Sequence, residues 1–325
     1  MPVGRLMISF IVPVRNDAVR LGKCLEAIRR NDCDPQEVEI VVADNGSVDE
    51  SPDVARSAGA TGLDLPGHRV TALRNIGAGR ATADVLAFCD ADNLIGPAWV
   101  GIVHSLFEDP RVAAVGTSYS PPEPCTWVQH AYDGLRDHSP GTRSTRWLGA
   151  GNMAVRRSAF EEVGGFDESL ETCEDVDLCN RLRTAGWMLL SDSRLSNVHL
   201  GDPETLNEVF WGELWRGRNN LKVSLRGKPS WRDLPSIALP VVNLGLLGAA
   251  SVGLLAAPFG GLALFGIAIS GSIGLAVMRA LRMLQLSDRL GWRQVPQAFA
   301  VAGIYELARA LALIWTVDHH RNRKA

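Results

Sequence analysis

Two carboxylates separated by one residue end an apolar run in the N-terminal half of the chain. Asp90 and Asp92 follow Val85–Cys89, whose unbroken apolar character predicts a buried strand. Paired carboxylates at the end of a strand suit a hard divalent cation, Mn²⁺ or Mg²⁺, that also binds phosphate oxygens. The triplet alone is a weak signal, because many surface loops contain one, and the strand before it strengthens the interpretation.

Two other polar loops follow predicted strands. Asn16 and Asp17 come after Ile8–Val14, and Asp44 comes after Val38–Ala43. Each loop opens a predicted helix, so carboxylates and backbone N–H groups meet at the carboxyl end of a strand, an arrangement that binds phosphorylated ligands. The blander interpretation of the loop after Asp44 is an ordinary turn.

A third acidic feature opens a helix later in the chain. Glu174, Asp175 and Asp177 crowd its first turn, and the helix is expected to stop at Gly186. Crowding of carboxylates should raise the pKa of one of them, which suits a base, whereas the helix N-terminus lowers it. The alternative is that these acids only favour the helix start.

The elements that must position these residues alternate between strand and helix. Apolar strands separated by helices predict an α/β fold with a mainly parallel sheet covered on both faces. Capping boxes are predicted at residues 47–50 and 158–161. The predicted strands are 8–14, 38–43, 85–89, 112–117 and 148–155, and the predicted helices are 17–30, 50–58, 76–83 and 97–107.

The chain changes character after Pro235. Residues 237–278 form a stretch of 42 residues without a charge, interrupted by Pro258 and two glycines. That length predicts two antiparallel transmembrane helices, 237–257 and 262–278; the alternative is a buried hairpin in a soluble protein. Basic residues flank the stretch on both sides, so the positive-inside rule predicts a multi-pass protein of the cytoplasmic membrane with its catalytic domain facing the cytoplasm.

Two further segments are expected to meet the membrane. Residues 297–317 carry Glu306 and Arg309 and either span the bilayer or lie in its interface. Residues 202–225 read as an amphipathic helix whose arginines contact either lipid headgroups or the phosphates of a bound ligand. The predicted division is a catalytic domain at 1–200, an interfacial region at 201–234 and a membrane region at 235–325.

Composition narrows the function classes. The net charge is −3, and no basic stripe of the kind that binds nucleic acid is visible. The six cysteines contain no CxxC pair, which indicates a reducing compartment. Met7–Val14 is too short for a secretory core, so the catalytic domain is expected to stay where it is made.

The ordered motifs resemble glycosyltransferase family 2, whose members have the A-type nucleotide-sugar-binding fold. The motifs lie within residues 8–200, about three fifths of the chain, and five of them in order make chance similarity implausible. They are FIVPVRND, VVADNGSVDES, ALRNIGAGRATADVLAFCDADN, GAGNMAVRRSAFEEVGGFDESL and CEDVDLCNRLRTAGW.

The resemblance implies roles on the donor side of a site. The loop after the first strand would cradle the nucleotide, Asp44 would hydrogen-bond its base, and Arg74 would approach the donor, although Leu73 replaces the usual alanine before it. Asp90 would contact ribose and metal, Asp92 would ligate the metal directly, and His199 would complete the metal shell unless it is only structural. The nucleotide-cradling residues implied are Pro13, Val14, Asn16 and Asp17.

The resemblance also implies an acceptor side. Asn152 and Glu174 would line it, and Asp175 would be the general base that deprotonates an acceptor hydroxyl during inversion. The processive QxxRW signature is missing, so one sugar per binding event is expected.

Three functions stay open at this point. The leading hypothesis is an inverting transferase that moves a sugar from a nucleotide-sugar to a hydroxyl of a lipid-linked or membrane-proximal acceptor in envelope polysaccharide or glycolipid assembly. A second reading makes the acceptor polyprenyl phosphate, which needs no strong base. A third, of another class, is a non-catalytic module that binds a nucleotide-sugar at the membrane.

Overall fold

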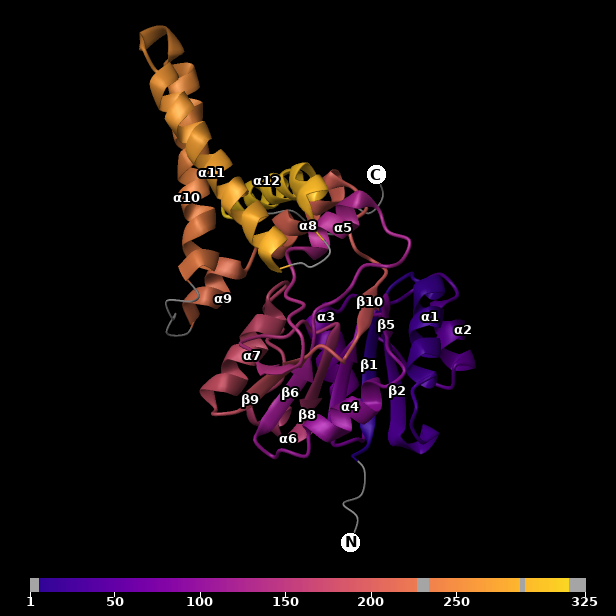
Figure 1. The fold of residues 1–325 in the computed structure, drawn as a ribbon. Helices are drawn as coiled ribbons and strands as arrows, with labels where there is room; N and C mark the ends of the chain where they lie inside the picture. The colour runs from indigo at the N-terminus through magenta and orange to yellow at the C-terminus, as the bar shows by residue number, and fades with distance from the viewer. Residues whose placement is uncertain (1–5, 227–233, 287–289, 316–325) are drawn as a thin grey trace. The chain divides into compact units, whose positions relative to one another are not determined.

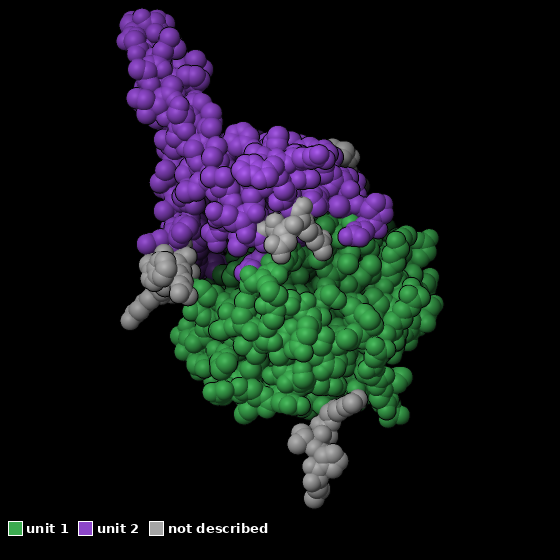
Figure 2. Space-filling model, viewed as in Figure 1, with its two compact units in different colours: residues 1–122, 138–202 green, residues 123–137, 203–325 purple. Residues whose placement is uncertain are grey.

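The computed structural model describes residues 6–226, 234–286 and 290–315. The chain forms two compact units, coloured separately in Figure 2. Unit 1 comprises residues up to 122 together with 138–202, and unit 2 comprises 123–137 together with the chain from 203 onward. Unit 2 is discontinuous in sequence because the short segment 123–137 packs with the C-terminal part. The contiguous division at residues 200 and 234 expected from the sequence stays a prediction.

Unit 1 is built on an eight-stranded, mainly parallel sheet (Figure 1). The strand order is β3-β2-β1-β4-β8-β6-β9-β7; β1 runs parallel to β2 and β4, and β8 lies antiparallel between β4 and β6. A separate antiparallel pair joins β5 and β10. The strands are β1 Ile8–Val14, β2 Val38–Asp44, β3 Thr61–Asp64, β4 Val85–Cys89, β5 Asn93–Ile95, β6 Val112–Gly116, β7 Thr142–Ser144, β8 Asn152–Arg156, β9 Met188–Asp192 and β10 Asn197–His199.

Helices cover both faces of this sheet. Because successive side chains of a strand point to opposite faces, Phe10 packs in one cluster with Leu25 and Trp99, and Ile11 packs in the other with Leu178. Full burial of such side chains stabilises the fold by about 1.5–3 kcal/mol each. The helices are α1 Ala18–Arg29, α2 Ser51–Ser57, α3 Val70–Arg80, α4 Trp99–Leu106, α6 Arg157–Glu162 and α7 Glu174–Thr184, with a 3₁₀ turn at Pro35–Glu37.

The expected α/β fold is confirmed, and two elements of unit 1 differ from their predicted ranges by more than two residues at a boundary. The helix expected at 76–83 is α3, which already begins at Val70. The strand expected at 148–155 is β8, which begins only at Asn152 because the preceding glycine-rich segment forms a turn. All six cysteines are free thiols.

Unit 2 is helical. Its C-terminal hairpin, α10 and α11, turns at the predicted Pro258–Gly261 stretch, where Gly260 has φ of 90°. The helices are α5 Trp127–Asp133, α8 Leu206–Arg216, α9 Asn220–Arg226, α10 Leu234–Leu255, α11 Leu262–Leu286 and α12 Val295–Leu311, with 3₁₀ turns at Ala257–Phe259 and Trp292–Gln294.

The hairpin helices are long and apolar enough to cross a membrane. α10 has 22 residues with a mean hydropathy of 1.9, and α11 has 25 residues with 1.8. Only 22% and 11% of their most apolar stretches are buried, which is unlike the core helices of a soluble protein. α11 extends eight residues beyond the predicted end at Met278 and so includes Arg279 and Arg282.

The helix predicted within 297–317 is α12, which packs into unit 2. Ala298 and Val301 of α12 share a hydrophobic cluster with Val128 of α5 and Met283 of α11. Residues 316 and 317 lie outside the described part of the chain, and whether this segment spans a bilayer stays open.

A buried ionic group joins α5, α8 and α12. Glu213 accepts hydrogen bonds from Tyr132 at 2.6 Å and from Arg216 at 2.9 Å, and Arg309 lies 3.9 Å away. Arg216 is thus held by a neighbouring carboxylate, a use that neither sequence interpretation of the 202–225 helix anticipated.

Candidate active site

The loops that carry the predicted donor-side residues meet at one edge of the sheet. Val14 lies opposite Asp44 in the β1–β2 register, and Ile11 lies opposite Phe88 in the β1–β4 register. The three strands are parallel, so their carboxyl ends face the same way, as ligand sites in such sheets require.

The loop after β1 is fastened to the loop after β2. Asn16 adopts a left-handed conformation with φ of 51°; its N–H donates to Ser47 Oγ at 2.8 Å, and its Oδ1 accepts from the Val48 N–H at 2.8 Å. The Asp17 N–H donates to Ser51 Oγ at 3.2 Å. The serines therefore hold the two loops together. The predicted capping boxes at 47–50 and 158–161 are wrong, since α2 begins at Ser51 and α6 at Arg157, each without a side-chain cap.

Pro13 and Val14 contribute through the backbone. Both are buried residues of β1, and the Val14 carbonyl accepts a hydrogen bond from the Asn45 N–H at 2.9 Å. They place Asn16 and Asp17 at the sheet edge without presenting side chains to it.

Asp44 has one satisfied and one unsatisfied oxygen. Its Oδ1 accepts from the Ser47 N–H at 2.7 Å, whereas its buried Oδ2 has no hydrogen-bond partner among the described residues. A buried carboxylate oxygen without a donor is costly, so it suits a ligand that brings an N–H or O–H group.

Arg74 joins two distant motifs. Its Nη2 lies 2.7 Å from Asp90 Oδ1 and its Nη1 lies 2.7 Å from Glu174 Oε1. The side chain is only 4% exposed, and burial alone would lower its pKa, but the two carboxylates outweigh burial and raise the pKa. The guanidinium therefore serves protein carboxylates and fixes the first turn of α7 beside the end of β4.

Asp175 is the carboxyl group best suited to take up a proton. Desolvation by the surrounding protein and then the charge of Glu174 raise its pKa to about 7, against the opposing effects of the Val176 N–H, Arg74 and the Ala150 N–H. The Val176 N–H donates to Asp175 Oδ1 at 2.8 Å. The third acid of the turn, Asp177, is used structurally, because Arg181 binds it at 2.8 Å.

Tyr119 lies within the electrostatic reach of both acidic motifs. Burial, then the charges of Asp90 and Asp175, raise its pKa, so its hydroxyl stays protonated. The hydroxyl accepts from the Gly151 N–H at 3.1 Å, and the ring lies 5.3 Å from the His199 ring.

Asp92 and His199 form a second cluster. His199 Nε2 lies 3.4 Å from Asp92 Oδ2, and Arg20 Nη1 lies 3.8 Å from the same oxygen. His199 Nδ1 lies 2.6 Å from the buried Asp202 Oδ1. Burial lowers the pKa of His199, and the hydrogen bonds to Asp202 and Asp92 outweigh burial and raise it to about 9.

The donor set of this cluster fits a divalent cation. Carboxylate oxygen and imidazole nitrogen are ligands that Mn²⁺ accepts, and the Asp202 contact on Nδ1 turns Nε2 toward Asp92, as outer partners of metal-binding histidines do. Across residues 6–226, 234–286 and 290–315, no three His, Cys, Asp or Glu side chains are already gathered as a ligand cluster. Asp92 and His199 would therefore supply two ligands, and substrate oxygens would complete the shell.

Asn152 differs from the other predicted site residues, because its amide binds structural partners and not the acidic residues of the site. It is buried; its Oδ1 accepts from Trp99 Nε1 at 2.8 Å, and its Nδ2 donates to the Leu195 carbonyl at 3.1 Å. The amide thus ties β8 to α4, and its predicted place on the acceptor side stays a prediction. The backbone of Gly151 stands nearer the acids: a Cβ there would lie 2.7 Å from Asp90 Oδ2.

Three residues of the site were not found from the sequence. Arg20 bridges Asp17 at 2.7 Å and Asp92, Tyr119 lies near both acidic motifs, and Asp202 orients His199. Two of them had a local signal, since Asp202 follows His199 by three residues and Arg20 follows Asp17 by three.

With this geometry in place, comparison with known proteins identifies the fold family. Residues 9–164 match the model described as "Glycosyl transferase family 2". Residues 9–164 belong to glycosyl transferase family 2. The match includes β1 to α6 of unit 1, and therefore Asp44, Arg74, Asp90 and Asp92.

Curated proteins with sequences similar to this chain are transferases. Validoxylamine A glucosyltransferase of Streptomyces hygroscopicus subsp. limoneus is 30% identical over 280 residues, which cover 65% of this chain and 60% of the relative. This chain thus spans less than two thirds of that relative's length. The N-acetylglucosaminyl-diphospho-decaprenol L-rhamnosyltransferase of Mycobacterium tuberculosis (strain CDC 1551 / Oshkosh) is 52% identical over 50 residues, 15% of this chain and 16% of the relative.

A solved structure has the same fold. It is a mannosyltransferase from Pyrobaculum calidifontis in complex with GDP-Man and Mn²⁺, with a TM-score of 0.66 and 18% sequence identity over 97% of this chain and 88% of that one. At this identity the likeness establishes the A-type glycosyltransferase fold and nothing finer.

Proposed function

We propose that the chain is an inverting, cation-dependent glycosyltransferase that moves a sugar from a nucleotide-sugar to a hydroxyl of a membrane-associated acceptor. One observation carries the proposal: Arg74 holds Asp90, at the end of β4, and Glu174, beside Asp175, at 2.7 Å each. This contact supports a donor-side motif and a base that act at one place, as transfer between two substrates requires.

The donor side is assigned from the acids at the sheet edge. The unpartnered Oδ2 of Asp44 suits a hydrogen bond from the nucleotide base, and Asn16 and Asp17 hold the loop on which the nucleotide rests. Asp92, His199 and, after release from Arg74, Asp90 would hold Mn²⁺ or Mg²⁺. The cation would neutralise the charge of the departing diphosphate.

The transfer step needs one proton acceptor. As the acceptor oxygen forms its bond to the anomeric carbon, the bond from that carbon to the diphosphate oxygen breaks, and the hydroxyl proton passes to Asp175. A carboxyl group with a pKa of about 7 is ionised in a large fraction of molecules at neutral pH and is basic enough to hold the proton afterwards. Glu174 is assigned to the acceptor side of the same turn.

The raised pKa of Asp175 favours a hydroxyl acceptor over polyprenyl phosphate. A phosphate is already ionised at neutral pH and gains nothing from a base, whereas a hydroxyl must lose its proton. The name of the rhamnosyltransferase relative describes a lipid diphosphate that carries a sugar, and a sugar offers hydroxyl acceptors of this kind.

A membrane location is proposed from the hairpin. α10 and α11 would cross the cytoplasmic membrane, with the family 2 domain on the cytoplasmic side, because Arg226 precedes the hairpin and Arg279, Arg282 and Arg293 follow its apolar part. Lys228, Arg232 and Arg289, also named in the charge argument, lie outside the described residues. A role in envelope polysaccharide or glycolipid assembly follows from this location.

The proposal is tested with the full chain in detergent. Release of nucleoside diphosphate from UDP-, GDP- and dTDP-sugars is measured with Mn²⁺ or Mg²⁺, and donor binding is measured separately by calorimetry. Asp175→Asn should abolish turnover and leave donor binding intact, and Asp44→Asn should weaken donor binding. Full turnover in both Asp175→Asn and Asp92→Ala would refute the assigned mechanism.

A further inference from the structure

An exposed arginine follows the apolar part of α11. The 17 uncharged residues from Leu262 to Met278 rise by about 25 Å, close to the roughly 30 Å of a bilayer's hydrocarbon core. Arg279 and Arg282 come next, so they stand at the level where hydrocarbon gives way to lipid headgroups.

The two arginines face different surroundings. Arg279 pairs with Glu306 of α12 and lies 4.3 Å from the Tyr305 ring centroid, so its charge is neutralised inside unit 2. Arg282 is exposed, and no hydrogen bond or ion pair joins it to any other described residue. Among the described residues, Arg282 is therefore a cation without a counter-ion.

The last turns of α11 pack within unit 2. Ala280 and Met283 of α11 share a cluster with Val128 and Ala131 of α5.

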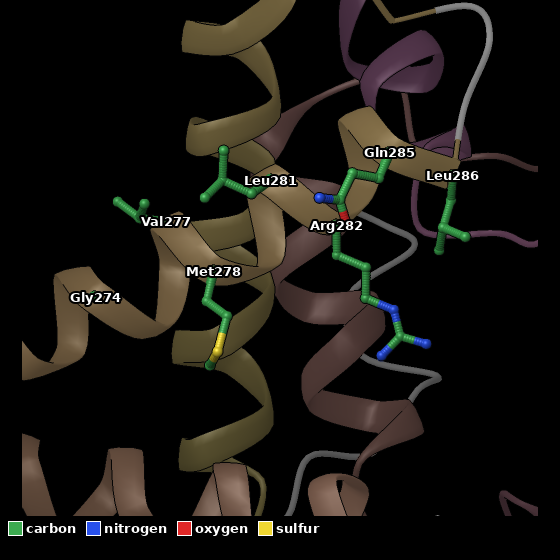
Figure 3. A pocket seen from close by; sticks show the side chains of 7 residues that line it. All are labelled: Gly274, Val277, Met278, Leu281, Arg282, Gln285 and Leu286. Carbon is green, nitrogen blue, oxygen red and sulfur yellow. The ribbon is translucent and has the colours of Figure 1, made fainter.

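A shallow, open space lies over the exposed face of α11 at Arg282, and residues of α11 alone line it. It has a volume of about 540 Å³, and Figure 3 shows the Met278 and Arg282 side chains extending in the same direction along it. Apolar side chains precede Arg282, and Gln285 follows it one turn later. The lining residues are Gly274, Val277, Met278, Leu281, Arg282, Gln285 and Leu286.

This pattern matches a phospholipid. The exposed apolar side chains Val277, Met278 and Leu281 suit an acyl chain, and a guanidinium pairs with phosphate oxygens through two parallel N–H groups. An arginine at this depth also extends its charge toward the phosphate layer. We propose that the α11 face around Arg282 and Gln285 binds the phosphate of an anionic phospholipid, with Val277, Met278 and Leu281 along its acyl chain.

This inference rests on the proposed membrane crossing, and a separate measurement tests that premise. Alkaline carbonate should leave the wild-type chain in the membrane pellet; release into the supernatant would contradict the membrane location itself. The lipid experiment then reports on Arg282 alone, without any assay of turnover.

The experiment compares two lipids on the full chain in detergent by native mass spectrometry. Dioleoylphosphatidylglycerol carries the phosphate, and dioleoylglycerol has the same chains without it. Wild type should retain the phospholipid about fivefold more than the diacylglycerol, the ratio expected for one arginine at an anionic surface. Arg282→Gln should abolish that preference, and Arg282→Lys should keep part of it.

Arg293→Gln serves as the matched control, because Arg293 is an exposed arginine of unit 2 outside this space. It should leave the preference unchanged, and circular dichroism should show equal helix content in all variants. Three results would overturn the inference: an unchanged preference in Arg282→Gln, displacement of phosphatidylglycerol by equimolar undecaprenyl diphosphate, or a dimer that dissociates on Arg282→Gln.

Discussion

Arg74 Nη1 lies 2.7 Å from Glu174 Oε1, across 100 residues of sequence. The contact joins α3 to the first turn of α7 and leaves the second guanidinium nitrogen for Asp90. Arg74, Asp90 and Glu174 belong to separate sequence motifs but form one electrostatic unit. A change of charge at one of them should alter the electrostatic environment of the other two.

Removal of the Arg74 charge should destabilise the protein strongly. Arg74→Gln leaves Asp90 and Glu174 without their counter-ion, and breaking a buried pair typically costs about 3–5 kcal/mol. Arg74→Lys keeps the charge but cannot reach both carboxylates with a planar fork, so an intermediate loss is expected. Thermal unfolding of the full chain measures both; a melting temperature of Arg74→Gln equal to that of Arg74→Lys would contradict the bridging role.

Turnover should depend on pH through Asp175. Its pKa is raised to about 7, and only the ionised form accepts a proton, so kcat/KM should fall as the pH drops below about 7. Glu174→Gln removes the neighbouring negative charge and leaves more of the Arg74 charge to act on Asp175. Both effects lower the pKa, because Tyr119 stays neutral in this range. The acid limb of the pH–rate profile should therefore move to lower pH.

The control for this profile is Glu161→Gln. Glu161 is an exposed acid that lies 3.6 Å from Arg157 and is not among the groups that shift Asp175. The acid limb of the Glu161→Gln pH–rate profile should coincide with that of wild type. An acid limb that is the same in Glu174→Gln and wild type would show that another group controls the profile.

Asp175 should also reduce stability at high pH. Its folded pKa lies above the ordinary value of 3.8, so the folded state retains a proton that the unfolded chain has released, and stability falls as the pH rises toward and through 7. Asp175→Asn should accordingly stabilise the protein at pH 8 by roughly 1–3 kcal/mol and have little effect at pH 4. Melting temperatures at both pH values measure this; a less stable variant at pH 8 would mean that the ionised carboxylate is satisfied in the fold.

The sequence correctly predicted the elements whose apolar residues are contiguous in the chain. β1 and β4 lie where predicted, because each is an unbroken apolar run that ends in polar residues. The start of α3 was missed because Val70–Leu73 follows Arg69 without a side-chain cap, and that stretch is held by burial of Ala72 and Leu73 against the sheet.

Site residues within a contiguous motif were predicted from the sequence. Residues whose roles depend on contacts with distant parts of the chain were missed. Asp90 and Asp92 are recognised from their strand, whereas the direction of the Asn152 amide depends on Trp99, 53 residues earlier. Tyr119 and Arg20 take on their roles through contacts with residues far along the chain, and no spacing rule in one sequence reveals such contacts.

Asp202 should control the cation affinity of the site. Its carboxylate holds His199 Nδ1 at 2.6 Å, which leaves Nε2 directed at Asp92. Loss of such an outer partner typically weakens metal binding by about 10–100-fold, so Asp202→Ala should raise the Kd for Mn²⁺ by that factor. Electron paramagnetic resonance of free Mn²⁺ in the presence of nucleoside diphosphate measures this without any turnover, and an unchanged Kd would remove His199 from the metal shell.

A side chain at Gly201 should disturb the Asp92–His199 pair. A Cβ at this position would collide with Asp92 Oδ2 and lie 3.3 Å from His199 Nε2, so Gly201→Ala must displace the Asp92 carboxylate from the histidine. Gly79→Ala is the matched control, because a Cβ at Gly79, in α3, meets no atom within 4 Å. Gly201→Ala should lose Mn²⁺-dependent turnover by at least about tenfold, the scale of a misplaced catalytic group, with a melting temperature within a few degrees of wild type. Because the collision is with the carboxylate itself, wild-type turnover in Gly201→Ala would mean that the position of Asp92 does not matter to the reaction.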